Sequence, residues 1–271
     1  NNVIYTCADI GPQVATLQRQ DVHGNTNTCT ATVTVQDCTA PTAVCQPSNY
    51  IVQVSSVGFV SVQASSLDFG SFDDCGIDPN GFKANGLDSL IYSCANVGIP
   101  DTVVLTVADI FGNTATCTTV IEVIDNENPI ARCGGPVNAV LSASGTVTIA
   151  AFSINATLPS TPSSDNCGIA SYLINGQANY AYDCTALGSN TAVLTVTDLS
   201  GNSDTCQAIV NILDNTPPTA SCLFSANITL NQAGVATLSA DTLVLSTSDN
   251  CGIDSILANG QQVLSFGCSD I

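Results

Sequence analysis

The sequence of 271 residues has no methionine and no tryptophan, and its only basic residues are Arg19, Lys83 and Arg132. Three cations are too few for the basic patch that a nucleic acid or an anionic membrane surface requires. There is one histidine, His23, and no Cys-x-x-Cys pair, which argues against a zinc site. No apolar run reaches the length of a membrane span. We therefore expect no nucleic-acid partner and no membrane insertion.

Cysteine and acidic residues are abundant instead. The chain has 14 cysteines, and 22 acidic residues give it a net charge of −19. This many cysteines in a chain with few other reactive groups indicate disulfides formed in an oxidising compartment. We therefore expect an extracellular or cell-surface location.

The cysteines recur at matched positions in a cassette of 88–89 residues. The first position holds Cys45, Cys133 and Cys222; the second, in Asp/Asn-Cys-Gly-Ile, holds Cys75, Cys167 and Cys251; the third holds Cys7, Cys94, Cys184 and Cys268; the fourth holds Cys29, Cys117 and Cys206. A period of this length indicates a tandem array of small domains.

Val- and Thr-rich runs with alternating polarity predict strands over 102–108, 116–124, 191–197 and 205–213. Gly-Asn turns at 109–113 and 198–202 join them into hairpins. Short strands, frequent turns and a core stapled by cysteines predict an all-β fold, a linear array of disulfide-stapled immunoglobulin-like β-sandwiches.

Three strings carry a family resemblance: Thr-Val-x-Asp-x-x-Gly-Asn-x-x-Thr-Cys, Val-x-Asp-Asn-x-x-Pro and Ser-Asp-Asn-Cys-Gly-Ile. With them the chain resembles, over nearly its whole length, the hyalin-repeat (HYR-like) immunoglobulin-type modules of secreted Bacteroidota surface proteins and adhesins. The resemblance implies extracellular adhesion or structure rather than chemistry. The cysteines depart from the animal form of the repeat, and Cys38 lies outside the fourfold scheme.

The repeat predicts four segments, of which only the middle two are complete. Residues 1–38 match the second half of a repeat, 39–126 and 127–215 are whole repeats, and 216–271 match the first half. A half sandwich would expose an apolar face and a sheet edge. We therefore expect the N-terminal half of one molecule to complete the C-terminal half of another by strand addition, giving a head-to-tail homopolymer. The rival interpretation is that the 271 residues are a window on a longer repeat protein.

Within a repeat we expect the first cysteine to pair with the fourth and the second with the third, although four cysteines allow three pairings. The expected pairs are Cys45–Cys117, Cys75–Cys94, Cys133–Cys206, Cys167–Cys184 and Cys251–Cys268, then Cys29–Cys222 between subunits, and Cys7–Cys38.

Catalysis is not expected, because the sequence has no nucleophile elbow, phosphate loop or metalloprotease motif. We interpret His23 as a turn residue, and the pair Asp73 and Asp74 as equivalent to the turn pairs Asp165-Asn166 and Asp249-Asn250. No cofactor is expected apart from calcium, for which Asp125, Glu127 and Asp214 offer oxygen ligands beside the hairpin acids. The alternative is that these acids cap turns and stay solvated.

The Bacteroidota resemblance implies O-glycans at Asp-Ser/Thr followed by an apolar residue. That pattern occurs at Ser89, Thr102, Thr242 and Ser255.

The first functional hypothesis is a structural subunit of an extracellular fibre assembled by strand complementation. The alternatives are a stalk segment of a cell-surface adhesin and an array of carbohydrate-binding modules, the last disfavoured by the lack of tryptophan platforms.

Overall fold

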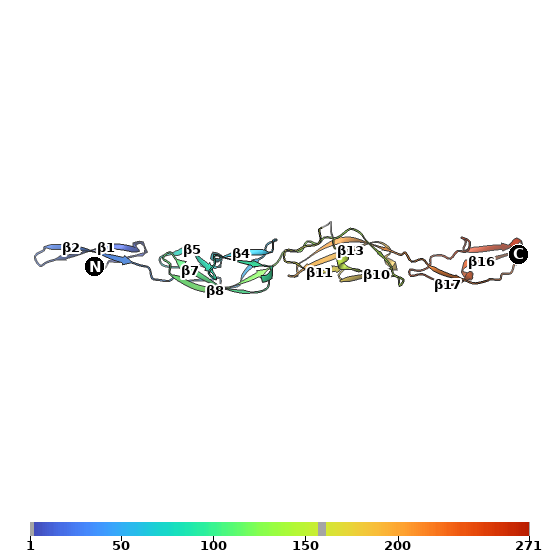
Figure 1. The fold of residues 1–271 in the computed structure, drawn as a ribbon, viewed down its shortest axis with the longest axis horizontal. Coiled ribbons are helices and arrows are strands. Elements are labelled where there is room, and N and C mark those ends of the chain that lie inside the picture. The colour runs from blue at the N-terminus through green and yellow to red at the C-terminus, as the bar shows by residue number, and fades with distance from the viewer. Residues whose placement is uncertain (1–2, 157–160, 271) are drawn as a thin grey trace. The chain divides into compact units, whose positions relative to one another are not determined.

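The computed structural model describes residues 3–156 and 161–270. Strands and short 3₁₀ turns make up the regular structure of these residues, which include no α-helix (Figure 1). The chain divides into two compact units, Asn1–Glu127 and Asn128–Ile271, and this division falls beside the expected boundary between residues 126 and 127. The fold is the expected all-β, immunoglobulin-like sandwich array.

The first unit opens with a lone hairpin. The 3₁₀ turn η1 (Cys7–Asp9) leads into β1 (Gly11–Gln20) and β2 (Thr26–Val35), which form a two-stranded antiparallel sheet (Figure 1). The register runs from Gly11 opposite Val35 to Gln20 opposite Thr26. Neither strand has a buried side chain.

A complete sandwich, which we call module 1, follows this hairpin. Its elements are β3 (Tyr50–Gln53), β4 (Phe59–Gln63), η2 (Ala64–Leu67), β5 (Ile77–Ala84), β6 (Ser89–Ser93), η3 (Cys94–Asn96), β7 (Asp101–Asp109) and β8 (Thr114–Ile124). One sheet has the order β3-β8-β7-β5, with β3 parallel to β8, and the other sheet pairs β4 with β6. The expected hairpin strands over 102–108 and 116–124 are thus β7 and β8.

The alternating sequence of the long hairpin builds the core of module 1. Val103, Leu105 and Val107 of β7 and Ile121 and Val123 of β8 are fully buried. Their polar neighbours lie on the other face of the sheet, as a strand period of two residues requires. Leu67, Val62 and Ala64, from β4 and η2, are also buried.

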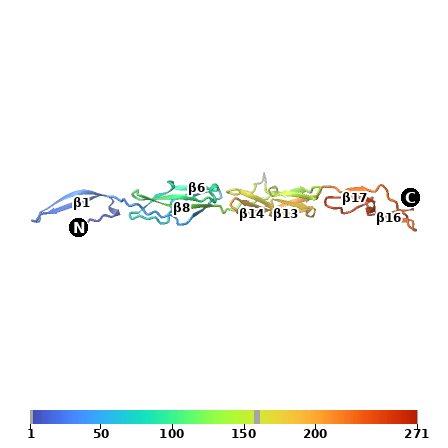
Figure 2. The same cartoon turned by 90° about the horizontal axis from the view of Figure 1, so that it is seen from below.

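Module 2 repeats this plan in the second unit (Figure 2). Its elements are β9 (Val137–Val140), β10 (Thr146–Ala150), η4 (Ala151–Ile154), β11 (Ile169–Ile174), β12 (Asn179–Asp183), η5 (Cys184–Ala186), β13 (Gly188–Asp198) and β14 (Ser203–Leu213). The sheets are β11-β13-β14-β9 and β10-β12. The core includes Leu194, Val210, Ile212, Ile154 and Ile174.

The rest of the second unit, which we call the half-module, has fewer strands. It contains β15 (Thr219–Cys222), β16 (Val235–Ser239), η6 (Ala240–Leu243), β17 (Val244–Ser248), β18 (Val263–Gly267) and η7 (Cys268–Asp270). These strands form two separate pairs, β15 with β17 and β16 with β18. The half-module therefore retains the β4–β6 type of sheet and lacks the four-stranded one.

One carboxylate organises the turn of each long hairpin. In module 1, Asp109 Oδ1 accepts the backbone N–H groups of Phe111 (2.8 Å) and Asn113 (2.9 Å), and Asp109 Oδ2 accepts Asn113 Nδ2 (2.7 Å). Gly112 supplies the positive φ of 91° that the turn needs. Asp21 makes the same three bonds in the N-terminal hairpin, and His23 there donates its backbone N–H to Asp21 Oδ1. His23 is therefore a turn residue, as interpreted from the sequence.

Candidate functional site

The half-module carries an apolar groove where modules 1 and 2 have a filled core. A cavity of about 340 Å³ is lined by Leu243, Ala240, Ile256 and Ala258. A second, of about 460 Å³, is lined by Leu230, Leu238, Leu264 and Phe266 among others. The residues aligned with Leu243 in modules 1 and 2, Leu67 and Ile154, are fully buried.

Two segments of the half-module remain irregular because their ladder partner is missing. Residues 225–230 align with β3 and β9, and residues 252–257 align with β5 and β11; neither segment forms a strand. In modules 1 and 2 these strands hydrogen-bond to the long hairpins β7–β8 and β13–β14. The half-module contains no equivalent hairpin among its described residues.

The N-terminal hairpin has the opposite defect, because its inward positions have nothing to pack against. Leu17 stands at the place of Leu105 and Leu194, counted from the turn aspartate, and Val33 stands at the place of Ile121 and Val210. Leu17 is 59% exposed and Val33 37%, whereas their four counterparts are fully buried. The hairpin thus presents an unfilled apolar face.

The disulfides follow the repeat, with one change. The structure contains Cys45–Cys117 and Cys133–Cys206, the two pairs expected within whole repeats between first and fourth cysteines. Their Cα atoms are 5.7 Å apart in both cases. Each staples the segment before the first strand of a module to its last strand.

The expected pairing of second with third cysteines is wrong. Cys75 bonds to Cys7, not to Cys94 or Cys38, and Cys184 bonds to Cys251, so Cys167–Cys184 and Cys251–Cys268 do not form. Cys94 and Cys167 are also disulfide-bonded. The reason is topological: the strands that the second and third cysteines flank, β5 and β6 or β11 and β12, belong to different sheets. In both of these bonds the third cysteine is joined to the second cysteine of the repeat that follows.

Four exposed cysteines keep free thiols: Cys29, Cys38, Cys222 and Cys268. Cys29 lies on β2, at the place of Cys117 on β8. Cys222 ends β15, at the place of Cys45 and Cys133. Cys29 is therefore the fourth cysteine of a repeat without its first-cysteine partner, and Cys222 is a first cysteine without its fourth.

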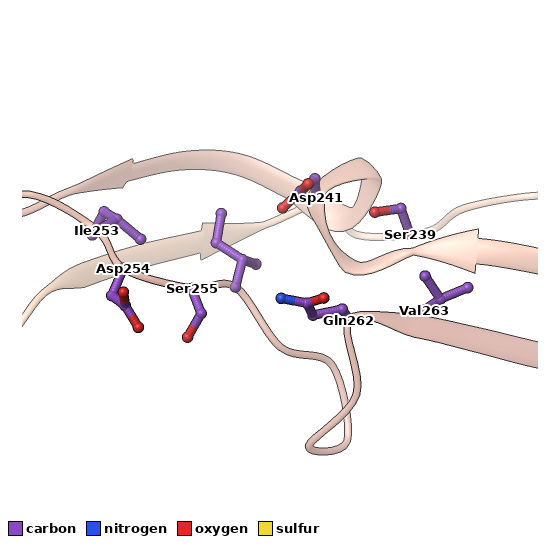
Figure 3. A pocket seen from close by; sticks show the side chains of 8 residues that line it. Ser239, Asp241, Ile253, Asp254, Ser255, Gln262 and Val263 are labelled. Carbon is purple, nitrogen blue, oxygen red and sulfur yellow. The ribbon is translucent and has the colours of Figure 1, made fainter.

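A pocket of mixed character lies beside the groove (Figure 3). Asp241 of η6 and Asp254 both line it, together with Ser239, Ser255 and Gln262. No basic residue lines this pocket. A cation entering it would meet two carboxylates. Both acids precede glycan candidates, Thr242 and Ser255, but 13 positions separate them in the sequence, so the sequence did not indicate that they line one pocket.

The turn acids at the second cysteine behave as interpreted, and they bring a further feature. Asp73 Oδ1 accepts the N–H groups of Cys75 (2.9 Å) and Gly76 (3.2 Å), and Asp37 Oδ1 accepts the N–H of Thr39 (3.0 Å). The Oδ2 atoms of Asp37 and Asp73 are buried without a hydrogen-bond partner. Carboxylate oxygens of the two residues lie within 4.8 Å of each other. A hard cation would suit these oxygens, whereas the disulfide-bonded Cys75 is no metal ligand.

The residues expected to bind calcium lie in turns. Asp125 is buried, and its Oδ1 accepts the N–H of the exposed Glu127 at 3.2 Å. Asp214 Oδ1 accepts the N–H of Thr216 and the side-chain amide of Asn250, both at 3.0 Å. These bonds are the capping contacts that the alternative interpretation expects.

The four glycan candidates are surface residues. Thr102, Thr242 and Ser255 are exposed, and Ser89 is half-buried. The acid that precedes Thr102 is engaged, because Tyr92 donates its hydroxyl to Asp101 at 2.7 Å. Burial, and then this bond to Asp101, raises the pKa of Tyr92.

The basic residues are dispersed. Lys83 forms an ion pair with Asp88 that is open to solvent, and Arg132 donates to Thr161 Oγ1 at 2.6 Å. Arg19 is exposed on β1. Among the described residues no helix is long and apolar enough to cross a membrane.

No protein-family model matches the chain, and no curated protein matches it. Solved structures that resemble it include the protocadherin GammaB4 extracellular domain (13% identity, 83% of this chain, 41% of that one, TM-score 0.29). Others are the I-band fragment I67–I69 from titin (11%, 77% and 76%, TM-score 0.33) and extracellular domains 3–5 of Drosophila OTK (12%, 76% and 72%, TM-score 0.25). The chain spans 41–64% of the length of the first three protocadherin structures.

Proposed function

We propose that the chain is a structural subunit of an extracellular filament, in which hairpin β1–β2 of one copy completes the half-module of another. The observation that carries the proposal is a matched pair of deficits. The half-module lacks a long hairpin like β7–β8 of module 1 and β13–β14 of module 2. The N-terminal hairpin β1–β2, in turn, lacks the neighbouring strands and the core that β7–β8 and β13–β14 have in their modules. Because donor and acceptor are at opposite ends of the chain, the contact is head-to-tail, and it builds a filament when the rotation between copies does not close a ring.

Modules 1 and 2 supply the register that we propose for this contact. In module 1, Asn85 exchanges two hydrogen bonds with Val104: Val104 N–H donates to Asn85 Oδ1 (3.0 Å), and Asn85 N–H donates to the Val104 carbonyl (2.9 Å). Asn175 makes the same two bonds with Val193 in module 2. The half-module has Asn259 at this place, with the same positive φ of about 50°. Thr16 is the hairpin residue that the alignment sets against Asn259.

The same register supplies the missing core. Leu17 comes opposite Ala258, just as Leu105 pairs with Ala84 and Leu194 with Ile174. Val33 and Val35 take the places of Ile121 and Val123, over the second cavity of the half-module. Burying these side chains on docking removes apolar surface from water on both copies.

Charge complementarity favours this occupant as well. Arg19 stands at the place of Val107 and Val196, and it comes opposite Ile256. Ile256 lines the same pocket as Asp241 and Asp254. A buried arginine requires a carboxylate partner. The one position where the hairpin departs from the apolar core pattern therefore faces the pocket with two acids.

A disulfide would make the contact covalent. In modules 1 and 2 the first cysteine bonds to the fourth across the closed sandwich. Docking sets Cys222 of one copy against Cys29 of the next in the same relation, and both thiols are exposed before docking. An extracellular thiol oxidant would join them. An oxidising, extracellular site of action also fits the disulfides already in the chain.

Electron microscopy and sedimentation of the purified full chain test the proposal. We expect filaments whose non-reducing gel ladder collapses to monomers with a reductant and denaturant. The variant Cys29→Ser/Cys222→Ser should still assemble but lack the cross-linked Cys29–Cys222 peptide in a non-reducing digest, whereas Cys38→Ser should keep that peptide. A chain that stays monomeric at every concentration, with its two ends folded on each other, would overturn the proposal.

We also propose that the chain carries glycans and binds calcium. Glycans on Ser89, Thr102 or Thr242 would shield strand surfaces, whereas a glycan on Ser255, which lines the groove, would compete with docking; the intact mass of native protein tests all four. Calcium at Asp125, Glu127 or Asp214 would join oxygens of the turns and linkers. A melting temperature that a chelator leaves unchanged would exclude bound calcium.

A further inference from the structure

Three of the four third cysteines share one location in the repeat. Each begins a 3₁₀ turn directly after a strand, with its Sγ beside the carbonyl oxygen of a turn glycine: Cys94 at 3.5 Å from Gly58, Cys184 at 3.6 Å from Gly145, and Cys268 at 3.7 Å from Gly234. Cys94 and Cys184 are disulfide-bonded in this location, and Cys268 is free and exposed. Cys268 is therefore held in the position of a bonded third cysteine.

The structure also specifies the partner of a third cysteine. Cys184 Sγ bonds to Cys251 and lies 3.3 Å from the carbonyl oxygen of Asn250, the residue before Cys251. Cys7 Sγ bonds to Cys75 and lies 3.5 Å from the carbonyl oxygen of Asp74, the residue before Cys75. The partner is thus the cysteine of an Asp/Asn-Cys-Gly-Ile turn. All three such cysteines in the chain, Cys75, Cys167 and Cys251, are already bonded.

Cys7 is a third cysteine without the strand that normally precedes it. Residues 3–6 are in no strand, and Val3 and Ile4 are 72% and 82% exposed. Cys268 follows β18, which is paired over five residues with β16. Residues 4–9 (Ile-Tyr-Thr-Cys-Ala-Asp) and 265–270 (Ser-Phe-Gly-Cys-Ser-Asp) are versions of the same segment.

The proposed docking brings these two segments into conflict. When hairpin β1–β2 of one copy lies in the half-module of another, residues 4–9 of the first and 265–270 of the second are assigned to the same place. The second segment is anchored in a sheet, and the first is held by the Cys7–Cys75 bond and the cap between Thr6 and Asp9. The anchored segment keeps the position, so Cys268 comes to the side of Cys75 where Cys7 is bonded.

We propose that docking is locked by thiol–disulfide exchange, in which Cys268 of one copy replaces Cys7 as the partner of Cys75 in the next. This inference rests on the proposed head-to-tail assembly. The Cys268 thiolate attacks Cys75 Sγ, the Cys268–Cys75 bond forms, and the Cys7–Cys75 bond breaks. Cys7 leaves as a thiolate and takes up the proton that Cys268 lost. One disulfide and one thiol exist before and after the step, so it needs no oxidant or reductant.

Mixing unlabelled and ¹⁵N-labelled full-length protein under anaerobic conditions tests the exchange. After assembly, free thiols are alkylated, the filaments are digested without reduction, and linked peptides are identified by mass spectrometry. We expect Cys75–Cys268 peptides with one labelled and one unlabelled half, and a matching gain of alkylated Cys7. Cys184–Cys251 peptides should stay unmixed, which excludes general disulfide shuffling.

Two variants separate the exchange from the docking on which it rests. Cys268→Ser should abolish the mixed peptide while light scattering still reports assembly, and Cys38→Ser, which removes another exposed thiol, should change neither. Filaments that retain Cys7–Cys75 would overturn the exchange and leave head-to-tail assembly standing. A mixture that fails to assemble would overturn both.

Discussion

Leu17 and Leu105 occupy equivalent places in two hairpins, but replacing Leu105 should lower the stability of the fold, whereas replacing Leu17 should weaken assembly. Leu105 is fully buried in module 1. Leu105→Ala should lower the free energy of unfolding of the first unit by about 2–5 kcal/mol, the range for a buried leucine that leaves a cavity. Leu17 is 59% exposed in the free chain. Leu17→Ala should therefore change the unfolding of the isolated chain by no more than about 0.5 kcal/mol.

The cost of Leu17→Ala should appear in assembly instead. If docking buries Leu17 as modules 1 and 2 bury its counterparts, the contact loses at least about 2 kcal/mol, a roughly 30-fold weaker association per interface. The assay is the critical concentration for filament formation, followed by light scattering, next to denaturant melts of the same samples. Leu87→Ala is the matched control, because Leu87 is 57% exposed in a turn outside the proposed contact. An unchanged critical concentration for Leu17→Ala, or an equal rise for Leu87→Ala, would refute the reasoning.

Three further predictions concern charge, the turns and the staples. Arg19→Glu should weaken assembly about 10- to 100-fold by removing a charged contact of about 1.5–3 kcal/mol, and adding Asp254→Arg in the same chain should recover part of it; equal effects of the single and double variants would contradict the pairing. Burial alone would raise the pKa of Asp109, but hydrogen bonds from the Asn113 side chain and the Phe111 and Asn113 N–H groups outweigh it and hold that pKa below its usual value. The lowered pKa in the folded state means that this stabilisation is present above about pH 4 and is lost as the pH falls through the folded-state value. Melting temperatures between pH 6 and pH 2 should therefore fall less steeply for Asp109→Asn, which should also melt lower at neutral pH; parallel curves would exclude the role. Cys133→Ser/Cys206→Ser opens a link across 73 residues and should cost the second unit about 4 kcal/mol in denaturant unfolding, and an unchanged midpoint would show that the staple carries no stability.

The hairpins could be predicted from the sequence because their determinants are local. Alternating Val and Thr, followed by Asp-x-x-Gly-Asn, specify strand, turn and strand over some twenty residues, and the carboxylate of Asp109 or Asp198 closes the turn by itself. The first-to-fourth disulfides followed from the repeat, because both cysteines belong to segments that every whole module contains.

The pairing of second and third cysteines could not be read in the same way. Cys75 and Cys94 are near in sequence and flank consecutive strands, which suggests a local bridge. The chain crosses from one sheet to the other between β5 and β6, a tertiary choice that no local pattern encodes. The buried oxygens of Asp37 and Asp73 were missed for a similar reason, since 36 positions separate them in the sequence. The recurrence of an acid before each second cysteine was the available signal.

The parallel pairing of the first and last strands in each module has a mechanical consequence. A tensile load that enters module 1 near β3 and leaves after β8 acts along two neighbouring strands in opposite senses, so it shears four residue pairs together instead of peeling them one by one. The Cys45–Cys117 bond also joins residues 72 positions apart, so the segment between them cannot be extended by force while the bond is intact. At about 3.5 Å per residue, about 250 Å of slack per module is withheld from stretching. A tandem array of such modules would therefore extend little under tension until a disulfide is reduced.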